Sequence, residues 1–471
     1  MTRMAAWLAR KPFWTVIVLG LALLLGGDWI LPLIDRDEPR FAEASREMRQ
    51  NSNFIIPYFN GDYRFDKPPL IYWCEAASSA VLGDNDFAAR LPTPLFAVAT
   101  AVLLLLWGRR LGQPDAGFYA ALMFLTCLQV LVHGRLAVAD MPMIFFFAAS
   151  VWSGWEMIQP QARPGWWWML HLSMALGFLA KGPEAFLPWA VAGWMGRQRP
   201  GAGKSLVLGG CLTLALVALW GVPALMQTHG EYWRIGIGKH VIHRSLGVME
   251  GHGASGWRYV ALLPLFFVTF FASFFPWALW VPGELRRGGE DALGKYLLTQ
   301  AALVFAVFTL AATKLPHYTL PAFPCLALWL ARRAAAPRRW AWGVAAMTCL
   351  AAVAIALFPF ARSRMLAANL WREAEPVLRP DTQVAALGFE EPSLVWEFRR
   401  VVTNPVQFIA LPQAAAFLRG PAPRCLVLPT KDWDDARFIH PAGARVVRAT
   451  GIDTASFKHW DVTAVILDGR P

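Results

Sequence analysis

The sequence has little charge and little cysteine. Only 16% of its 471 residues are charged, whereas 56% are hydrophobic, and this balance excludes an ordinary soluble protein of the same length. The six cysteines lie far apart and form no CxxC pair, so neither a disulfide framework nor a zinc site is expected. A complete nucleotide-binding glycine loop is also missing, because GAGKS at residues 201–205 lacks the full spacing of a phosphate loop.

Acidic residues are fewer than basic ones, which leaves a formal net charge of +12. The Lys and Arg residues stand mostly at the ends of apolar blocks and not on one soluble face. Such a distribution is typical of the cytoplasmic loops of membrane proteins. We therefore expect the basic residues to set the membrane topology, and we expect no nucleic acid as a partner.

Long apolar blocks fill the first 360 residues. They approach the roughly 20 residues that a helix needs to cross a 30 Å hydrocarbon core. The runs are unbroken, which excludes the alternating strands of a membrane β-barrel. The first block is too long for a secretory signal and is expected to remain as a helix. The sequence thus predicts an α-helical polytopic membrane protein with about 11 transmembrane helices. The expected spans are residues 12–31, 92–107, 114–132, 141–158, 166–180, 183–196, 205–226, 257–281, 296–313, 318–331 and 340–360.

The basic loops predict the orientation of these spans. With the N-terminus in the cytoplasm, loops rich in arginine fall on the inside, and the C-terminus lies outside. Every loop that mixes acids, bases, histidines and aromatic residues then falls on the outer side. These outer loops are residues 33–90, 133–140, 181–184, 228–256 and 314–318. We therefore expect one functional site at the outer face of the membrane.

The first outer loop, residues 33–90, carries the densest run of charge. It reads LIDRDEPRFAEASREM from Leu33, continues to Asp66-Lys67-Pro68-Pro69, and directly follows an apolar span. Charged side chains beside a membrane indicate a site that handles a charged group. Residues 71–83 are moderately apolar and too short to cross, which favours a helix lying in the membrane interface.

Beyond residue 360 the composition changes. Apolar runs shorten to strand length at 384–387, 425–428, 444–447 and 462–467, and helix-like stretches occur at 392–400 and 412–419. This pattern predicts a small α/β domain outside the membrane. We therefore expect a transmembrane catalytic domain at residues 1–360 and a small second domain outside the membrane at residues 361–471, whose role is packing or substrate recognition.

Several candidate site residues also have a plain structural interpretation. Asp37, Glu38 and Arg40 follow the pattern of a helix start as well as that of an anion site. Asp140 suits a helix cap as well as a catalytic acid, and Lys181 and Glu184 either neutralise each other or face a cavity. Further candidates are Arg64, Lys67, Arg244, Lys314, His317 and Tyr318. The histidines at 240, 243 and 252 are too loosely spaced to favour a metal over a solvated loop.

Together these loops supply carboxylates at Asp37, Glu38 and Asp140 and cations at Lys67, Lys181, Arg244 and Lys314. A reaction at a lipid-linked phosphate needs both kinds of group. Cations bind the phosphate and stabilise its charge as it leaves, while a carboxylate accepts a proton from an attacking hydroxyl. No pattern demands a metal, so the metal ligands are unknown; a divalent cation between such acids is chemically reasonable.

The order of six motifs resembles the bacterial membrane glycosyltransferases related to protein O-mannosyltransferases, in particular the aminoarabinose transferases that modify lipid A. The motifs are DRDEPRFAEASREM, NFIIPYFNGDYRFDKPPLIYW, FAARLP, RLAVADMP, FLAKGP and TKLPHYTLP. The resemblance covers most of residues 12–360 and implies a GT-C fold with a cavity beneath periplasmic interfacial helices. It further implies a polyprenyl-phosphate-linked sugar donor, transfer with inversion and an acceptor such as lipid A or another glycolipid.

The resemblance also implies roles for individual residues. Asp37 would be the catalytic carboxylate, shaped by Glu38 and Arg40, with Asp140 as a second acid. Lys67, Arg244 and Tyr318 would bind the donor phosphate, and Arg64, Lys181, Glu184, Lys314 and His317 would line the cavity. Phe41 stands where relatives often have tyrosine, which weakens the assignment of sugar and acceptor and leaves the reaction class intact.

The main alternative is a transporter or flippase for the lipid-linked sugar. Transporters usually show internal repeats and polar groups at the membrane midplane. Here no repeat is apparent, and the polar motifs gather at one face. An enzyme is therefore favoured, and membrane lipids are its expected surroundings. We expect it to act as a monomer.

Overall fold

The computed structural model describes residues 11–199, 201–243, 257–333, 337–435, 438 and 440–468. The chain forms two compact units. The first unit comprises Met1–Gly26, Phe65–Ile71 and Leu91–Val353, and the second comprises Gly27–Arg64, Tyr72–Arg90 and Ala354–Pro471. The predicted domain boundary at residue 360 is close to the boundary between Val353 and Ala354. Most of the first outer loop, however, belongs to the second unit.

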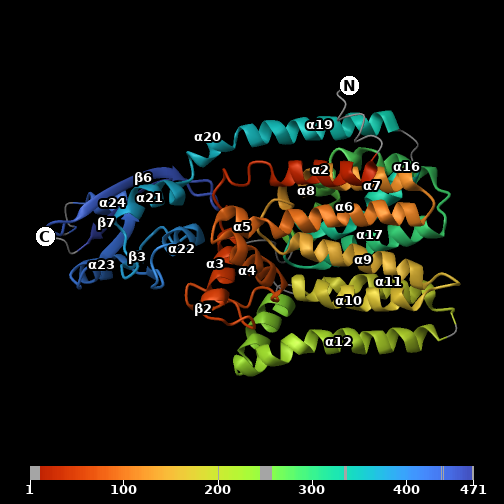
Figure 1. Ribbon diagram of the computed structural model, residues 1–471, viewed down its shortest axis with the longest axis horizontal. Coiled ribbons are helices and arrows are strands. Elements are labelled where there is room, and N and C mark those ends of the chain that lie inside the picture. The colour runs from red at the N-terminus through yellow and green to blue at the C-terminus, as the bar shows by residue number, and fades with distance from the viewer. Residues whose placement is uncertain are drawn as a thin grey trace. The chain divides into compact units, whose positions relative to one another are not determined.

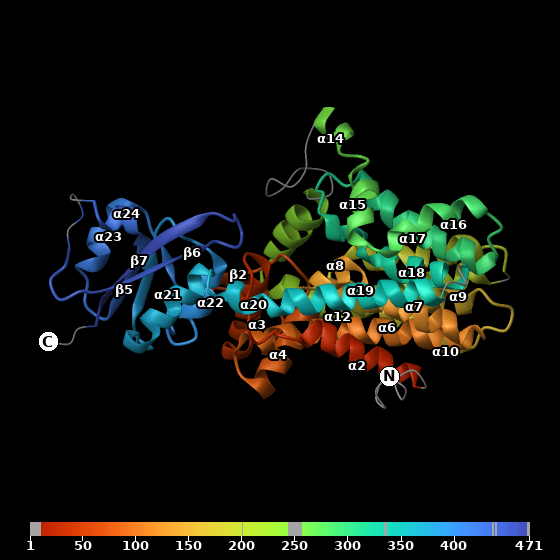
Figure 2. The same ribbon diagram turned by 90° about the horizontal axis from the view of Figure 1, so that it is seen from above.

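The first unit is a bundle of helices (Figures 1 and 2). Its α-helices are α2 (Pro12–Leu25), α6 (Pro92–Arg110), α7 (Pro114–Thr126), α8 (Leu128–His133), α9 (Asp140–Met157), α10 (Pro164–Ala180), α11 (Leu187–Gly196), α12 (Ala202–Gln227), α14 (Trp257–Ala261), α15 (Leu265–Ser273), α16 (Val281–Arg287), α17 (Ala292–Leu310), α18 (Phe323–Arg333) and α19 (Pro337–Ala356). Shorter 3-10 or π turns are η1 (Pro183–Phe186), η2 (Tyr232–His243), η3 (Trp277–Leu279) and η4 (Pro316–Ala322).

Proline and glycine explain much of this bundle. Several of its helices, including α2, α6 and α10, have proline in one of the first two positions, where a missing N–H costs no hydrogen bond. Glycine lets α6 and α7 approach closely, since a Cβ on Gly108 would lie 2.3 Å from the Cα of Gly117. Helices α6, α9, α10 and α12 lie side by side in this order (Figure 1), and residues of α6 and α9 belong to the apolar core.

Four helices in the described part of the chain are long and apolar enough to cross a membrane: Asp86–Arg110, Gly203–Gln227, Ala292–Leu310 and Arg339–Ala356. A fifth crossing results if the pair Tyr259–Ser273 and Trp277–Arg287, bent by 116°, counts as one span. The remaining predicted spans coincide with α2, α7, α9, α10, α11 and α18, which are 10–18 residues long. The chain is a multi-pass helical membrane protein, and the number of eleven spans stays a prediction.

The second unit combines a mixed sheet with helices from two regions of the sequence. Its helices are α3 (Asp37–Gln50), α4 (Leu70–Leu82), α5 (Asp86–Arg90), α20 (Phe358–Arg362), α21 (Leu366–Ala374), α22 (Pro392–Phe398), α23 (Leu411–Leu418) and α24 (Thr430–Trp433), with a 3-10 turn η5 (Glu375–Val377). Its strands are β1 (Tyr58–Phe59), β2 (Asp62–Tyr63), β3 (Gln383–Ala386), β4 (Gln407–Phe408), β5 (Arg424–Pro429), β6 (Arg445–Ile452) and β7 (His459–Leu467).

The five-stranded sheet has the order β4-β3-β5-β7-β6. Strands β4, β3 and β5 are parallel, whereas β7 is antiparallel to both β5 and β6. Alternate residues face opposite sides, so Val384 and Cys425 pack with α21 and α22, while Ala385 and Leu426 pack with α23. The α/β domain expected from the sequence is confirmed, with strands within a few residues of the predicted positions.

Candidate functional site

A cavity of about 380 Å³ opens in the first unit. Its walls come from the segment before α4, the turn between α10 and η1, and from α12, η2, α17 and η4. The charged and phenolic residues lining it are Asp66, Lys67, Lys181, Glu184, Tyr232 and Tyr318. Lys67, Lys181, Glu184 and Tyr318 were predicted as site residues from three separate loops, and the structure brings them together.

The remaining wall of this cavity is largely apolar. It is formed by Phe65, Phe178, Val217, Trp220, Leu225 and Phe308, among others. A cavity with an apolar wall and a few convergent charges suits an amphiphilic ligand with an anionic head.

Lys181 is held in place by Asp140. Its Nζ lies 2.7 Å from Asp140 Oδ1, and both residues are largely buried. The same ammonium lies over the ring of Tyr318, 5.5 Å from the centroid. Asp140 is the first residue of α9, the N-cap position is Ala139, and no side chain caps the helix. The alternative that Asp140 serves only as a helix cap is therefore less favoured than a role in orienting Lys181.

The turn after Lys181 depends on glycine. Gly182 adopts φ of +134°, a value that residues with a side chain rarely adopt. Pro183 then begins η1, and Glu184 follows on the cavity wall. The sequence Lys-Gly-Pro-Glu thus reverses the chain sharply at the end of α10 and presents both charges to the cavity.

Lys314 was expected to line the cavity, whereas its ammonium lies at the end of helix α17. Its Nζ donates hydrogen bonds to the carbonyl oxygens of Thr309 and Ala311, each at 2.6 Å. These carbonyls end helix α17, where a cation is favourable. Lys314 is also not among the residues lining the cavity, so its role in substrate binding stays a prediction.

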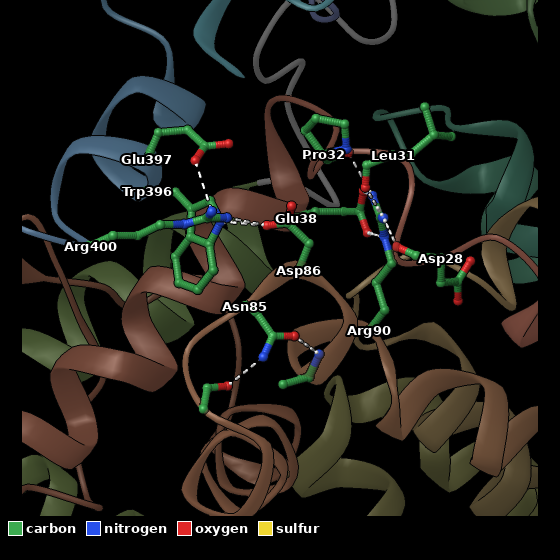
Figure 3. A network of polar contacts seen from close by, with 12 residues as sticks. Asp28, Leu31, Pro32, Glu38, Asn85, Asp86, Arg90, Trp396, Glu397 and Arg400 are labelled. Carbon is green, nitrogen blue, oxygen red and sulfur yellow. Dashed lines mark hydrogen bonds and ion pairs between the residues drawn. The ribbon is translucent and has the colours of Figure 1, made fainter. Parts of the chain in front are cut away.

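Most of the charged run in the first outer loop supports the second unit. Glu38 is buried and accepts hydrogen bonds from Arg90 Nε at 2.8 Å and Arg90 Nη2 at 2.7 Å (Figure 3). Arg90 also donates to the carbonyl oxygens of Asp28, Leu31 and Pro32. This bidentate pair fixes the entry to helix α3, so the geometry favours a structural role for Glu38.

Other members of the run bind residues of the C-terminal segment. Arg399 Nε lies 3.3 Å from Glu43 Oε1, and Arg399 Nη2 lies 3.5 Å from Glu47 Oε1. All three side chains are buried. Arg46 also pairs with Glu43. Burial raises the pKa of Glu43 to about 7, although the positive charge of Arg46 opposes this shift.

Asp37 and Arg40 differ from their neighbours. Asp37 is exposed and Arg40 is half-buried. Within the described part of the chain, neither side chain has a hydrogen-bond or ion-pair partner. They lie three residues apart in the first turn of α3, on one side of the helix. Of the predicted carboxylates in this run, Asp37 is therefore the one still available for chemistry.

Arg64 is largely buried in the second unit. Its Nε donates to the hydroxyl of Tyr72 at 3.0 Å, and its guanidinium lies over the ring of Phe41. Phe41 in turn stacks on Tyr72. A tyrosine at position 41 would add a hydroxyl to the ring that contacts Arg64 and Tyr72. Phenylalanine at this position, where relatives often have tyrosine, therefore changes the packing around Arg64. Its substrate-binding role stays a prediction.

Two predicted features, the phosphate-binding arginine and the histidine group, lie outside the described residues. Residues 244 and 252 are not described, nor are the side chains of His240 and His243. The phosphate-binding role of Arg244 and the alternative of a histidine metal site therefore stay predictions.

Three acidic side chains of the second unit lie close enough together to share a divalent cation. Asp35, Glu391 and Asp453 each place an oxygen within 4.8 Å of the others. Each carboxylate already accepts hydrogen bonds, from Ser393, Arg36 and Ala455 respectively. These donors satisfy the group without an ion, and no cation is invoked.

Arg90, Arg399 and His133 were not among the residues predicted from the sequence. Arg90 had a usable signal, because an arginine at the start of an apolar span needs an acidic or carbonyl partner. His133 stands beside the predicted site, and its ring centroid lies 4.7 Å from that of His317. The partner of Arg399 lies more than 350 positions away in the sequence, and nothing local indicates it.

The comparisons with known proteins agree with this geometry. Residues 66–224 match the family model described as dolichyl-phosphate-mannose-protein mannosyltransferase. A relative from Edwardsiella ictaluri, the undecaprenyl phosphate-alpha-4-amino-4-deoxy-L-arabinose arabinosyl transferase, is 33% identical over 66% of this chain and 58% of its own length. The transferase of the same name from Enterobacter sp. is 30% identical over 73% of this chain and 65% of its own length.

These matches support an ArnT-like glycosyltransferase of the GT-C type. The chain spans 54–65% of the length of the first relatives that it matches. The matched segment 66–224 supplies Lys67, Asp140, Lys181 and Glu184.

The fold agrees with this assignment. The crystal structure of ArnT from Cupriavidus metallidurans bound to undecaprenyl phosphate superimposes with a TM-score of 0.77 at 17% identity, covering 96% of this chain and 97% of that chain. The GT-C fold expected from the sequence is thus confirmed.

Proposed function

We propose that this protein is an inverting glycosyltransferase that moves a sugar from a polyprenyl-phosphate donor to lipid A or another glycolipid of the cell envelope. The observation that carries the proposal is the cavity of about 380 Å³ in which Lys67, Lys181 and Tyr318 converge on an apolar wall. The named relatives act on undecaprenyl-phosphate-linked aminoarabinose, which supports a donor of this class.

The cavity suits the two ends of such a donor. The ammonium groups of Lys67 and Lys181 and the hydroxyl of Tyr318 bind the phosphate, and the aromatic and aliphatic wall accommodates the first isoprene units. During transfer the bond between the anomeric carbon and the phosphate oxygen breaks, and the phosphate leaves with the bonding electrons. The cations stabilise the charge on this leaving group.

Asp37 is the proposed catalytic carboxylate. If the acceptor is a hydroxyl, Asp37 takes its proton as the oxygen attacks the opposite face of the anomeric carbon. If the acceptor is a phosphate, no proton has to be removed, and Asp37 instead positions the acceptor or stabilises positive charge on the sugar. Its exposure and lack of a partner among the described residues suit either role.

The remaining roles follow from the same proposal. Arg40 shapes the surroundings of Asp37, Arg244 assists at the donor phosphate, and Glu184 and His317 orient the substrates. The active site faces the periplasm of the bacterial inner membrane, and the protein acts as a monomer. No divalent cation is required by this scheme.

The deciding experiment is transfer in vitro. Purified protein is incubated with a polyprenyl-phosphate sugar pool and envelope lipids, and the lipids are analysed by mass spectrometry. Wild type is expected to add the mass of one sugar, Asp37→Asn is expected to abolish the addition, and Asp62→Asn serves as a control because Asp62 is an exposed carboxylate of the same unit. An undiminished product with Asp37→Asn would refute its catalytic role, while movement of the donor across the membrane without transfer would favour the flippase.

A further inference from the structure

A chain of polar side chains ends beside the candidate cavity. The hydroxyl of Ser273, the last residue of α15, donates to Gln129 Oε1 at 3.0 Å. The amide nitrogen of Gln129 lies 2.8 Å from His133 Nδ1, one turn further along α8. None of these three residues lines the cavity, and none has a role in the proposed reaction.

This chain selects one form of the His133 ring. Because Gln129 Oε1 accepts from Ser273, the NH₂ end of its amide is the end that faces the imidazole. An NH₂ group can only donate, so Nδ1 must be the accepting nitrogen. The ring proton of neutral His133 therefore lies on Nε2, and the ring cannot turn over without losing the bond to Gln129.

The oriented ring contacts the predicted site. The ring of His133 lies 4.7 Å from that of His317, tilted by 36°. His317 directly precedes Tyr318 in η4, and the two rings meet edge to face at 5.1 Å. Tyr318 lies under Lys181, which is bound to Asp140. A continuous series of contacts thus runs from Ser273 to the phosphate-binding side of the cavity.

The charged partners of Asp140 show why the orientation matters. Lys181 is its ion-pair partner, and both His317 and His133 are close enough to act on it electrostatically. A ring that swung toward Asp140, or carried a charge there, would compete with Lys181 for the carboxylate. The hydrogen bond from Gln129 to Nδ1 fixes how the His133 ring is oriented beside this pair.

We propose that His133 is a positioning residue for sugar transfer: Ser273 and Gln129 fix its ring against His317, and this contact sets the place of Tyr318 and of the Lys181–Asp140 pair in the cavity. The inference rests on the proposed function and extends it to three residues outside the cavity. It predicts a loss of turnover rather than of donor affinity, because the phosphate-binding groups remain present and only their alignment changes.

The test compares matched variants in the transfer assay. Ser273→Ala removes the hydroxyl, whereas Ser273→Thr keeps it. We expect Ser273→Ala, Gln129→Leu and His133→Ala each to lower kcat about tenfold or more with KM within about twofold, and Ser273→Thr to stay near wild type. The double variant Gln129→Leu/His133→Ala is expected to be no worse than either single variant, because the residues act as a unit.

Two results would overturn the inference. One is kcat within twofold of wild type for Gln129→Leu and His133→Ala; the other is fully additive losses in the double variant. Melting temperatures of the purified variants separate positioning from unfolding, since a merely structural residue would change stability without a specific loss of kcat.

A second readout does not depend on activity. In protein labelled with ¹⁵N-histidine, NMR is expected to show the Nε2–H tautomer of His133, assigned by comparison with His133→Ala, and to show its loss in Gln129→Leu. An unchanged tautomer in Gln129→Leu would refute the chain. Should the wild type transfer no sugar at all, the proposed function fails, and the tautomer still decides whether Ser273 and Gln129 orient His133.

Discussion

Arg90 binds both carboxylate oxygens of Glu38, at 2.8 and 2.7 Å, while Asp37, one position earlier, has no partner among the described residues. These two neighbouring acids therefore differ in burial and in pairing. Glu38 is buried and paired with a guanidinium, whereas Asp37 is exposed to solvent. This difference yields opposite expectations for their variants.

Glu38→Gln is expected to destabilise the protein. It leaves the buried guanidinium of Arg90 without its ionic partner, at a cost of about 3–5 kcal/mol. Asp37→Asn is expected to change stability by less than about 0.5 kcal/mol because the side chain is exposed. Thermal unfolding in detergent measures both, and a Glu38→Gln protein as stable as wild type would contradict the structural role.

Lys67→Met is expected to weaken use of the donor. Loss of one charge-assisted contact to a phosphate costs about 1.5–3 kcal/mol, which corresponds to roughly a 10- to 150-fold drop in kcat/KM. Lys295→Met is the control, since Lys295 is an exposed lysine in the first turn of α17, away from the cavity lining. Equal activity of the two variants would exclude Lys67 from phosphate binding.

Gly182→Ala is expected to disturb the cavity without touching a charge. A side chain at φ of +134° is strained, and the cost is about 1–3 kcal/mol. Relief of this strain would move Lys181 and Glu184, so transfer should fall together with stability. Gly165→Ala, where a Cβ meets open space at a helix start, is the matched control and should leave both unchanged.

The stability of the second unit is expected to fall as the pH rises through neutrality. Burial raises the pKa of Asp35 from 3.8 to about 7, with further contributions from the charges of Glu391 and Asp453. A carboxyl group with a raised pKa stabilises the fold below its unfolded pKa of about 4, and this contribution is lost as the pH increases through 7. The window is therefore about pH 4 to 8.

Hydrogen exchange of peptides from residues 27–64 can measure this effect. Wild type should become less protected between pH 5 and pH 8, whereas Asp35→Asn, which still accepts the hydrogen bond from Ser393 but does not titrate, should show a smaller change. A pH dependence that is identical in both proteins would assign the titration to other groups, such as Glu43.

The sequence predicted what local patterns encode. The length of the apolar runs predicted the helical bundle, and the shorter apolar runs after residue 360 predicted strands near β3, β5, β6 and β7. The cavity residues Lys67, Lys181 and Tyr318 were found because they occur in short motifs at one expected membrane face. These predictions needed no knowledge of which loops touch.

The partners of the charged residues could not be predicted in the same way. Acids in a first helical turn look alike in the sequence, and only the fold shows that Glu38 meets Arg90 and that Glu43 meets Arg399. The chain from Ser273 to His133 joins residues 144 and 4 positions apart. Lys314 illustrates the converse, since its motif predicts a substrate contact but does not indicate that its ammonium binds the carbonyl oxygens at the end of α17.

The contacts of Arg399 with helix α3 also limit how this protein can be recombined with its relatives. Helix α3, which bears Asp37, forms ion pairs with Arg399 near the far end of the sequence. A chimera that exchanges only the residues after 354 would keep Glu43 and Glu47 in α3 and would replace the segment that supplies Arg399. The buried acids of α3 would then face a segment that did not evolve with them. Segments 27–64, 72–90 and 354–471 form one compact unit, and a chimera should keep its stability only when all three are exchanged together.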